Sequence, residues 1–179
     1  MKKRIHIFGA SGSGTTTIAK EVAKALGYTH FDTDSYFWVQ TEEPSSLMRT
    51  PKDRIKLMNH DLKKSKKWIL SGALNGWGDC FISEFDLVVF VFVSPEERMK
   101  RLKKREFSRY GKEMLPGGKR YEREVEFLEW AAKYDDETFD GRSFKNQKEW
   151  FEALPCSVLE VNNQDLEKSI DIVIKAIAI

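Results

Sequence analysis

Residues that build disulfides and protein-only metal sites are scarce in this chain. Its 179 residues include two cysteines and three histidines, and neither Cys80 nor Cys156 has a partner at metal-ligand spacing. These counts argue against a disulfide framework and against a zinc site of the usual kind. We therefore expect two reduced, semi-buried thiols in a cytoplasmic protein.

Long apolar runs and a dominant charge are also absent. No run reaches the roughly 18 apolar residues that cross a bilayer, and no signal-peptide pattern precedes the first strand-like run, so we expect no membrane partner. The 30 basic and 28 acidic residues leave a net charge of +2, which does not favour a nucleic-acid partner. A hydrophobic content of 41%, without repeats or linkers, predicts one domain over residues 1–179.

A glycine-rich turn between an apolar run and a helical pattern is the strongest functional signal. The spacing Gly9-x-x-x-x-Gly14-x-Thr16 is that of a P-loop, whose backbone N–H groups converge on a phosphate at a helix N-terminus. A flexible turn between a strand and a helix is the alternative. The predicted nucleotide-binding residues are Gly9, Ala10, Ser11, Gly12, Ser13, Gly14, Thr15, Thr16 and Thr17.

The lysine expected in this motif is missing. Thr15 stands in its place, whereas Thr16 keeps the hydroxyl that would ligate Mg²⁺. Ile18, Val22 and Leu26 give the next segment an apolar helix face. The loop therefore keeps its phosphate-binding backbone but lacks a positive charge.

Two carboxylates stand at the end of the second predicted strand, residues 29–32. Asp32 and Asp34 stand at the carboxyl edge of an open α/β sheet, which is where ligands bind. We assign Asp32, together with Thr16, to the metal and Asp34 to a substrate hydroxyl. An Asx turn that caps the next segment is the alternative.

The P-loop and the two aspartates together carry a family resemblance. Residues 9–17 followed by Asp32-Thr33-Asp34 resemble the small P-loop kinases of metabolites and nucleotides, the shikimate kinase, gluconate kinase and adenylate kinase group. The resemblance implies an α/β, three-layer P-loop NTPase fold, with a parallel five-stranded sheet, helices on both faces and a helical lid insertion at about 109–143. It also implies ATP as the donor and Mg²⁺ as the cofactor.

The segment after the aspartates is expected on the acceptor side. Residues 35–50 mix aromatic residues with proline and serine, which suits either a substrate-covering loop or a plain surface loop. Thr50-Pro51-Lys52-Asp53 then has the pattern of a helix start. The resemblance makes Arg54 the best match to an arginine that grips an anionic group of the acceptor, with Arg49 second, and a solvated helix arginine is the alternative.

A glycine turn follows the third predicted strand, residues 68–71. Gly72 and Trp77 are acceptor-side candidates, because glycine at a strand end allows close approach of a ligand. No acidic residue ends this strand, so a standard Walker B aspartate is missing. Further along, the segments 145–154 and 157–161 are predicted as helix and strand, with Asn162-Asn163-Gln164 bordering the adenine.

A basic helix is predicted to begin at Ser94-Pro95-Glu96-Glu97, which combines an N-cap, a proline at N1 and a glutamate at N3. Arg98, Arg101 and Arg105 share one face of this helix, and Arg109 follows one turn later. The resemblance places the lid here, with arginines that neutralise charge on the transferred phosphoryl group, and a solvated basic face is the alternative. The predicted catalytic residues are Asp34, Arg105, Arg109 and, at the return of the lid, Arg142.

Three functions follow from these patterns. The leading one is ATP- and Mg²⁺-dependent phosphoryl transfer to a small-molecule acceptor, either a nucleoside monophosphate or a sugar or polyol acid, by a monomer or homodimer. The second is nucleotide binding with weak or no kinase activity, because Thr15 replaces the lysine. The third is a nucleic-acid-associated P-loop protein, since residues 98–120 interleave basic residues with Phe107 and Tyr110.

Overall fold

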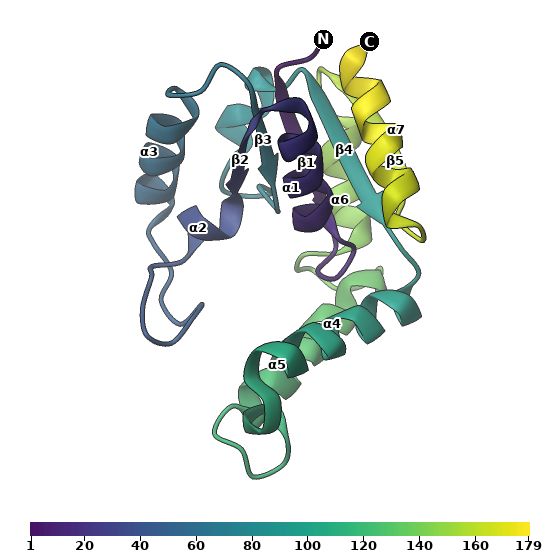
Figure 1. The fold of residues 1–179 in the computed structure, drawn as a ribbon. Helices are drawn as coiled ribbons and strands as arrows, with labels where there is room; N and C mark the ends of the chain where they lie inside the picture. The colour runs from purple at the N-terminus through teal and green to yellow at the C-terminus, as the bar shows by residue number, and fades with distance from the viewer.

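A parallel sheet organises the chain, which the computed structural model describes over residues 1–179 (Figure 1). The strands lie in the order β2-β3-β1-β4-β5, and every neighbouring pair is parallel. The predicted five-stranded parallel sheet is therefore confirmed. The strands are β1 (Arg4–Gly9), β2 (Thr29–Asp32), β3 (Trp68–Ser71), β4 (Leu87–Phe92) and β5 (Ser157–Asn162).

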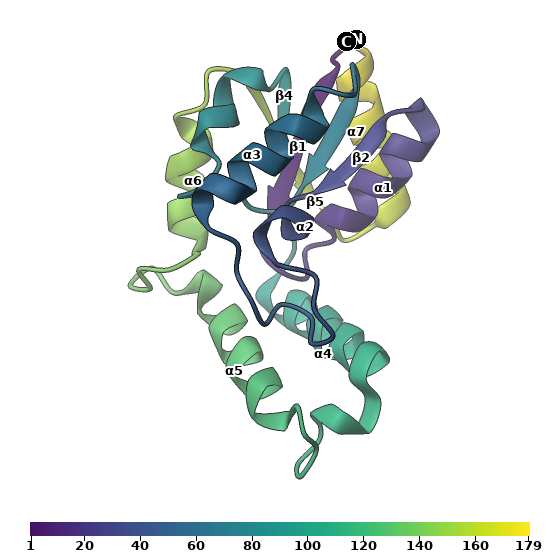
Figure 2. The ribbon, with the colours of Figure 1, turned by 90° about the vertical axis from the view of Figure 1, so that its left-hand side faces the viewer.

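Helices cover both faces of the sheet, as Figures 1 and 2 show. α1 (Thr15–Leu26) and α7 (Leu166–Ala178) pack on one face, while α3 (Pro51–Leu62) and α6 (Phe144–Glu152) pack on the other. β4 supplies both cores, because Val89 and Val91 face the first layer and Val88 and Phe90 face the second. Alternate residues of a strand point to opposite faces, so a strand buried on both sides needs a continuous apolar run.

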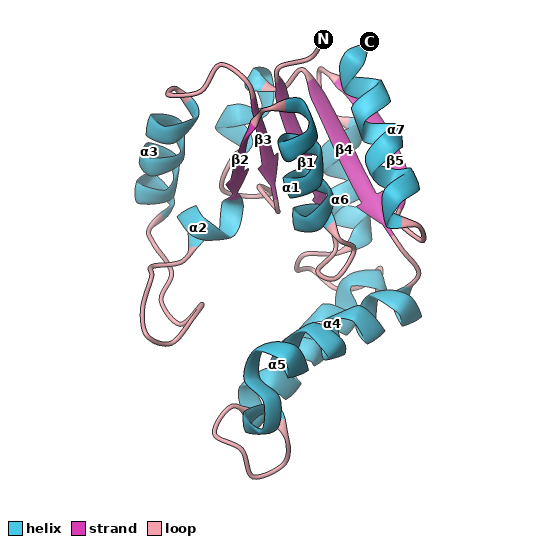
Figure 3. Cartoon of the chain, in the orientation of Figure 1, coloured by secondary structure: helices cyan, strands magenta, loops and turns pink.

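A helical hairpin projects from the carboxyl edge of the sheet (Figure 3). α4 (Pro95–Tyr110) leaves β4, the short 3₁₀ turn η2 (Gly111–Met114) follows, and α5 (Tyr121–Ala132) returns through η3 (Lys133–Asp135). Arg98 anchors the base of the hairpin, because its side chain is buried, donates to the Ala131 carbonyl at 2.9 Å and pairs with Asp135. The alternative of a solvated basic face therefore does not hold for Arg98.

Besides η2 and η3, two short elements were not predicted from the sequence. α2 (Thr33–Phe37) follows β2 directly, and η1 (Asp79–Glu84) precedes β4. The N-cap of α2 is the Asp32 side chain, which accepts from the Asp34 N–H, and so short a helix has no apolar periodicity to reveal it. The thiol prediction needs a correction too, because Cys80 is exposed and only Cys156 is half-buried. None of the helices has the length and apolar character that a bilayer crossing requires.

The second core contains one imidazole. His6 has no exposed surface, stacks between Phe8 and Phe85, and makes a hydrogen bond from Nδ1 to the Leu70 carbonyl at 3.1 Å. Burial lowers the pKa of His6 to about 3, although the hydrogen bond to Leu70 opposes this shift. The imidazole is therefore neutral in the folded protein at every pH near neutrality, whereas it titrates normally in the unfolded chain.

This difference predicts a loss of stability in mild acid. Because the unfolded chain binds the extra proton first, the free energy of unfolding falls as the pH drops below about 6.5, by about 2 kcal/mol at pH 5. His6→Phe keeps the ring stacking but removes the titration, so its stability should vary less between pH 7 and pH 5. Urea unfolding at both pH values measures this, with His60→Phe on the exposed surface of α3 as the control. Equal pH slopes for wild type and His6→Phe would contradict the assignment.

Candidate functional site

The P-loop is fixed between β1 and α1 by close contacts that only glycine permits. A Cβ at Gly9 would lie 2.1 Å from the Val91 carbonyl oxygen, and one at Gly14 would lie 2.4 Å from Nδ2 of Asn163. Gly14 also has φ +96°, and as the N-cap of α1 it offers no side chain to the first turn. The first N–H groups of α1 therefore lack a capping acceptor, which is the arrangement that binds anions.

Two side chains from distant segments hold this loop. Asn163, which follows β5, is 2% exposed and donates from Nδ2 to the Ser13 carbonyl at 2.8 Å. Arg142 donates to the Gly9 carbonyl. Asn163 was expected to border the adenine, but its side chain supports the phosphate loop instead. Its contact depends on two segments about 150 positions apart, so no local pattern could have indicated it.

The predicted metal-side residues lie together. Oγ1 of Thr16 donates to Oδ2 of Asp32 at 3.1 Å, and Oδ1 of Asp32 accepts from the Asp34 N–H at 3.0 Å. One oxygen of Asp32 thus caps α2, as in the Asx-turn alternative, while the other faces Thr16. No group of three or more histidine, cysteine, aspartate or glutamate side chains is placed to hold a metal. A hydroxyl and a single carboxylate fit Mg²⁺, which prefers oxygen ligands and takes most of its shell from phosphates and water.

Asp34 lies close enough to the predicted arginines for their charges to affect its pKa. Asp34 is exposed at the surface, and its pKa is raised, mainly through partial desolvation and further through the charge of Asp32. Arg142, Arg105 and Arg109 oppose this rise. The structure therefore brings all four predicted catalytic residues near one another.

A buried carboxylate orients the arginines of α4. Glu106 is 3% exposed and accepts from Nε of Arg105 at 2.5 Å, with Nη1 of Arg109 at 3.5 Å. Arg105 also lies over the Phe127 ring of α5, 5.9 Å from its centroid. A polar hollow of about 430 Å³ opens on this part of α4, lined by Arg101, Lys104, Arg105, Ser108 and Arg109.

Arg101 lies on the predicted basic face but was not among the predicted catalytic residues. Its Nη2 donates to the Asn163 carbonyl at 3.0 Å, and its Nε pairs with Glu97 at 2.9 Å. A Cβ built on Gly14 would lie 4.0 Å from Nη1 of Arg101, so this guanidinium stands beside the end of the P-loop. Its position on the predicted basic face was the only signal available in the sequence.

Arg54 lies on an aromatic surface on the acceptor side. Its guanidinium carbon sits 3.6 Å from the centroid of the Phe37 ring and 5.8 Å from that of Trp77, and its Nε donates to the Arg49 carbonyl at 2.8 Å. The two Nη atoms have no protein acceptor. Arg49, the second choice for an anion-binding arginine, is instead used internally, because it donates to the carbonyls of Ser35, Tyr36 and Trp38.

The glycine turn after β3 has a different purpose from the predicted one. A Cβ at Gly72 would lie 2.0 Å from Oγ1 of Thr33, so the side chain of α2, rather than a ligand, makes the close approach. Trp77 is half-buried and donates from Nε1 to the Ala73 carbonyl at 3.1 Å, which leaves its ring beside Arg54. The contact with Thr33 accounts for the glycine at position 72, and Trp77 lies beside Arg54.

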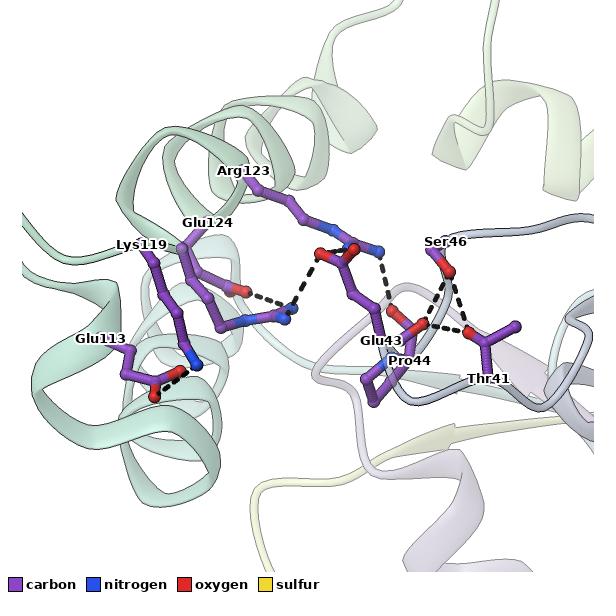
Figure 4. A network of polar contacts seen from close by, with 9 residues as sticks. Thr41, Glu43, Pro44, Ser46, Glu113, Lys119, Arg123 and Glu124 are labelled. Carbon is purple, nitrogen blue, oxygen red and sulfur yellow. Dashed lines mark hydrogen bonds and ion pairs between the residues drawn. The ribbon is translucent and has the colours of Figure 1, made fainter.

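The helical hairpin touches the loop between α2 and α3. Nη1 of Arg123 on α5 pairs with Glu43 at 2.6 Å, and Nη2 donates to the Pro44 carbonyl at 2.7 Å (Figure 4). Arg120 lies 3.8 Å from Glu43 and 3.3 Å from Glu124. These contacts join the hairpin to the loop between α2 and α3. A larger hollow, of about 760 Å³, lies at the other end of the sheet around Lys3 and shares no residue with the site.

Comparison with known proteins agrees with this geometry. The family model described as AAA domain, AAA_18, matches residues 5–129. Uncharacterized protein YqaC from Bacillus subtilis (strain 168) is 46% identical over 163 residues, which cover 91% of this chain and 90% of that protein. A cytidylate kinase from Archaeoglobus fulgidus is 34% identical over 114 residues, 58% of this chain and 62% of its own.

Solved structures share the fold at low sequence identity. Shikimate kinase from Bacteroides thetaiotaomicron superimposes with a TM-score of 0.55 at 18% identity over the whole of both chains. Shikimate kinase from Acinetobacter baumannii, in complex with shikimate, gives 0.58 at 14% identity over 98% of this chain and 93% of the other. A gluconokinase from Sinorhizobium meliloti gives 0.55 at 15% identity, over 98% and 91%. The chain therefore belongs to the AAA domain family AAA_18 and has the fold of the small P-loop kinases.

Proposed function

We propose that the protein transfers the γ-phosphoryl group of ATP to a hydroxyl of a small anionic acceptor. The observation that carries this proposal is the convergence of the uncapped N-terminus of α1, the Thr16–Asp32 pair and Asp34 at one edge of the sheet. Relatives named as kinases support it.

The P-loop provides the donor side. Backbone N–H groups of residues 10–16 would bind the β-phosphate, with the uncapped N-terminus of α1 adding its positive end. Mg²⁺, held by Thr16 and Asp32, would neutralise charge on the phosphate oxygens. The pairing of Thr16 with Asp32 directs the hydroxyl proton to the carboxylate and leaves the oxygen lone pairs for the metal.

Asp34 and Arg54 provide the acceptor side. The acceptor oxygen forms a bond to the γ-phosphorus, the bond from that phosphorus to the bridging oxygen breaks, and ADP leaves with the electron pair. The hydroxyl proton passes to Asp34, whose raised pKa makes it a better base. The free Nη atoms of Arg54 would pair with an anionic group of the acceptor.

The arginines around Asp34 are proposed to supply the charge that Thr15 cannot. Arg101 stands beside Gly14, and Arg105, Arg109 and Arg142 surround Asp34. Positive charge near the transferred group lowers the barrier because charge on its oxygens must be balanced. We therefore infer that the hairpin helix α4 acts as the cationic lid.

A coupled assay for ADP tests the proposal directly. The purified protein, ATP and Mg²⁺ should form ADP in the presence of one acceptor class from a panel of nucleoside monophosphates, sugar acids and polyol acids. The product should carry the phosphate in equal amount, which mass spectrometry measures. ADP formation that no acceptor stimulates would contradict the proposed transfer.

Substitutions on the acceptor side should change kcat or the acceptor KM but should not change ATP affinity. Asp34→Asn removes the proton acceptor and should lower kcat by roughly 10²-fold or more, and Arg54→Gln should raise the acceptor KM roughly 10- to 100-fold. Neither should change ATP affinity by more than a small factor. Lys56→Gln, an exposed change on the same helix as Arg54, is the control. Weakened ATP binding in either variant would move that residue to the donor side.

The lid assignment predicts a sharp difference between turnover and ADP binding. Arg105→Gln should reduce kcat roughly 10²- to 10³-fold while leaving ADP affinity nearly unchanged, because ADP lacks the phosphate that the guanidinium would hold. Lys103→Gln, an exposed change on α4 outside the polar hollow, should have no effect. Steady-state kinetics and ADP titration measure the two quantities.

Thr15 favours a second function, nucleotide binding with little or no transfer. The two functions differ in the response to Thr15→Lys, which restores the P-loop charge. A gain of orders of magnitude in activity, together with no loss in Arg105→Gln, would identify the natural protein as a nucleotide binder. Retained activity in wild type and its loss in Arg105→Gln support the kinase.

A further inference from the structure

The metal-side carboxylate is held by a second pair of residues that the proposed reaction does not yet use. Ser71, the last residue of β3, has no exposed surface and donates from Oγ to Oδ2 of Asp32 at 3.1 Å. Nε2 of His30 lies 2.9 Å from the same Oγ. The parallel register pairs Asp32 with Ser71, which is why a hydroxyl at the end of β3 reaches the carboxylate at the end of β2.

The direction of these hydrogen bonds is fixed by their chemistry. An ionised carboxylate only accepts, so the single hydroxyl proton of Ser71 goes to Asp32. The remaining lone pairs of Ser71 then accept from Nε2–H of His30. Without that donor, the Ser71 proton has a second acceptor in the Phe31 carbonyl at 3.4 Å. His30 therefore favours the rotamer that serves Asp32.

Three donors together determine the position of Asp32. Oδ2 accepts from Thr16 and Ser71 at 3.1 Å each, and Oδ1 accepts from the Asp34 N–H at 3.0 Å. This leaves the Thr16 oxygen with its proton committed and its lone pairs free. Residues that orient a metal ligand through hydrogen bonds commonly change metal affinity 10- to 100-fold when they are replaced.

We propose that Ser71 and His30 are positioning residues for the Mg²⁺ of the bound nucleotide, acting through Asp32 and Thr16. Ser71 ends β3, where an acidic residue is missing, so the carboxylate comes from Asp32 on β2 and is oriented by Ser71, which His30 on β2 contacts in turn. This inference rests on the proposed nucleotide site. It adds two residues that do not contact the metal themselves and act on it through hydrogen bonds to Asp32.

A purely structural role would give a different result. The same contacts also join β2 to β3, so their loss could lower stability without touching the metal. Metal dependence separates the two roles, because a structural change affects nucleotide binding equally with and without Mg²⁺. His30 is half-buried, so its replacement should lower stability less than replacement of the fully buried Ser71. His30 therefore provides a second variant to test.

The experiment is titration calorimetry of the full chain with the β,γ-imido analogue of ATP, in excess Mg²⁺ and in excess EDTA. Ser71→Ala and His30→Phe should each weaken binding about 10- to 100-fold with Mg²⁺, and should leave binding in EDTA unchanged. His30→Gln, which can present an amide N–H where Nε2 stands, should restore most of the Mg²⁺-dependent affinity. His60→Phe, an exposed change on α3, is the control.

Each remaining outcome decides the question. Equal losses in Mg²⁺ and EDTA, or no loss in His30→Phe while the variant melts like wild type, would overturn the positioning role and leave the proposed function in place. A wild-type protein that does not bind the analogue, or binds it equally with and without Mg²⁺, would overturn the proposed function itself. If His30→Gln does not recover affinity, the effect of His30→Phe comes from the loss of the imidazole itself and not from the lost hydrogen bond. That outcome would overturn the proposed action through Ser71.

Discussion

Close packing of the P-loop against the sheet is the constraint on which the rest of the site depends. Gly9 lies against the Val91 carbonyl and Gly14 against the Asn163 side chain, so the loop has no room to shift. Its path in turn fixes where the first N–H groups of α1 point and where Thr16 meets Asp32. A larger side chain at either glycine would therefore disturb several contacts at once.

The positive charge of the site is distributed rather than placed on one lysine. Arg101 and Arg142 each contact the frame of the P-loop, whereas Arg105 and Arg109 are oriented by the buried Glu106. A charge carried on α4 moves with that helix, while a lysine in the loop would be fixed to the sheet. The placement of charge thus depends on the geometry of the hairpin, whose base is held by Arg98.

The sequence predicted the features that follow from local patterns. The strand ends, the P-loop, the aspartates after β2 and the N-caps at Thr50 and Ser94 all depend on residues a few positions apart. Roles that depend on long-range contacts were missed or misassigned. Arg49 and Arg98 are arginines whose partners are carbonyls or a carboxylate brought near by folding, and Gly72 accommodates Thr33. The His30–Ser71 contact joins residues 41 positions apart and needs the strand register to exist.

The contact between α5 and the loop after α2 bears on how firmly the hairpin is held to the rest of the chain. Glu43 is exposed and is reached by the half-buried Arg123 on α5 and by Arg120, the N-cap residue of that helix. Exposed ion pairs contribute only about 0–1 kcal/mol each, and salt weakens them further. Separation of the two segments would break these ion pairs and the hydrogen bond from Arg123 to the Pro44 carbonyl. Higher ionic strength would therefore loosen the hold of α5 on this loop without changing the fold.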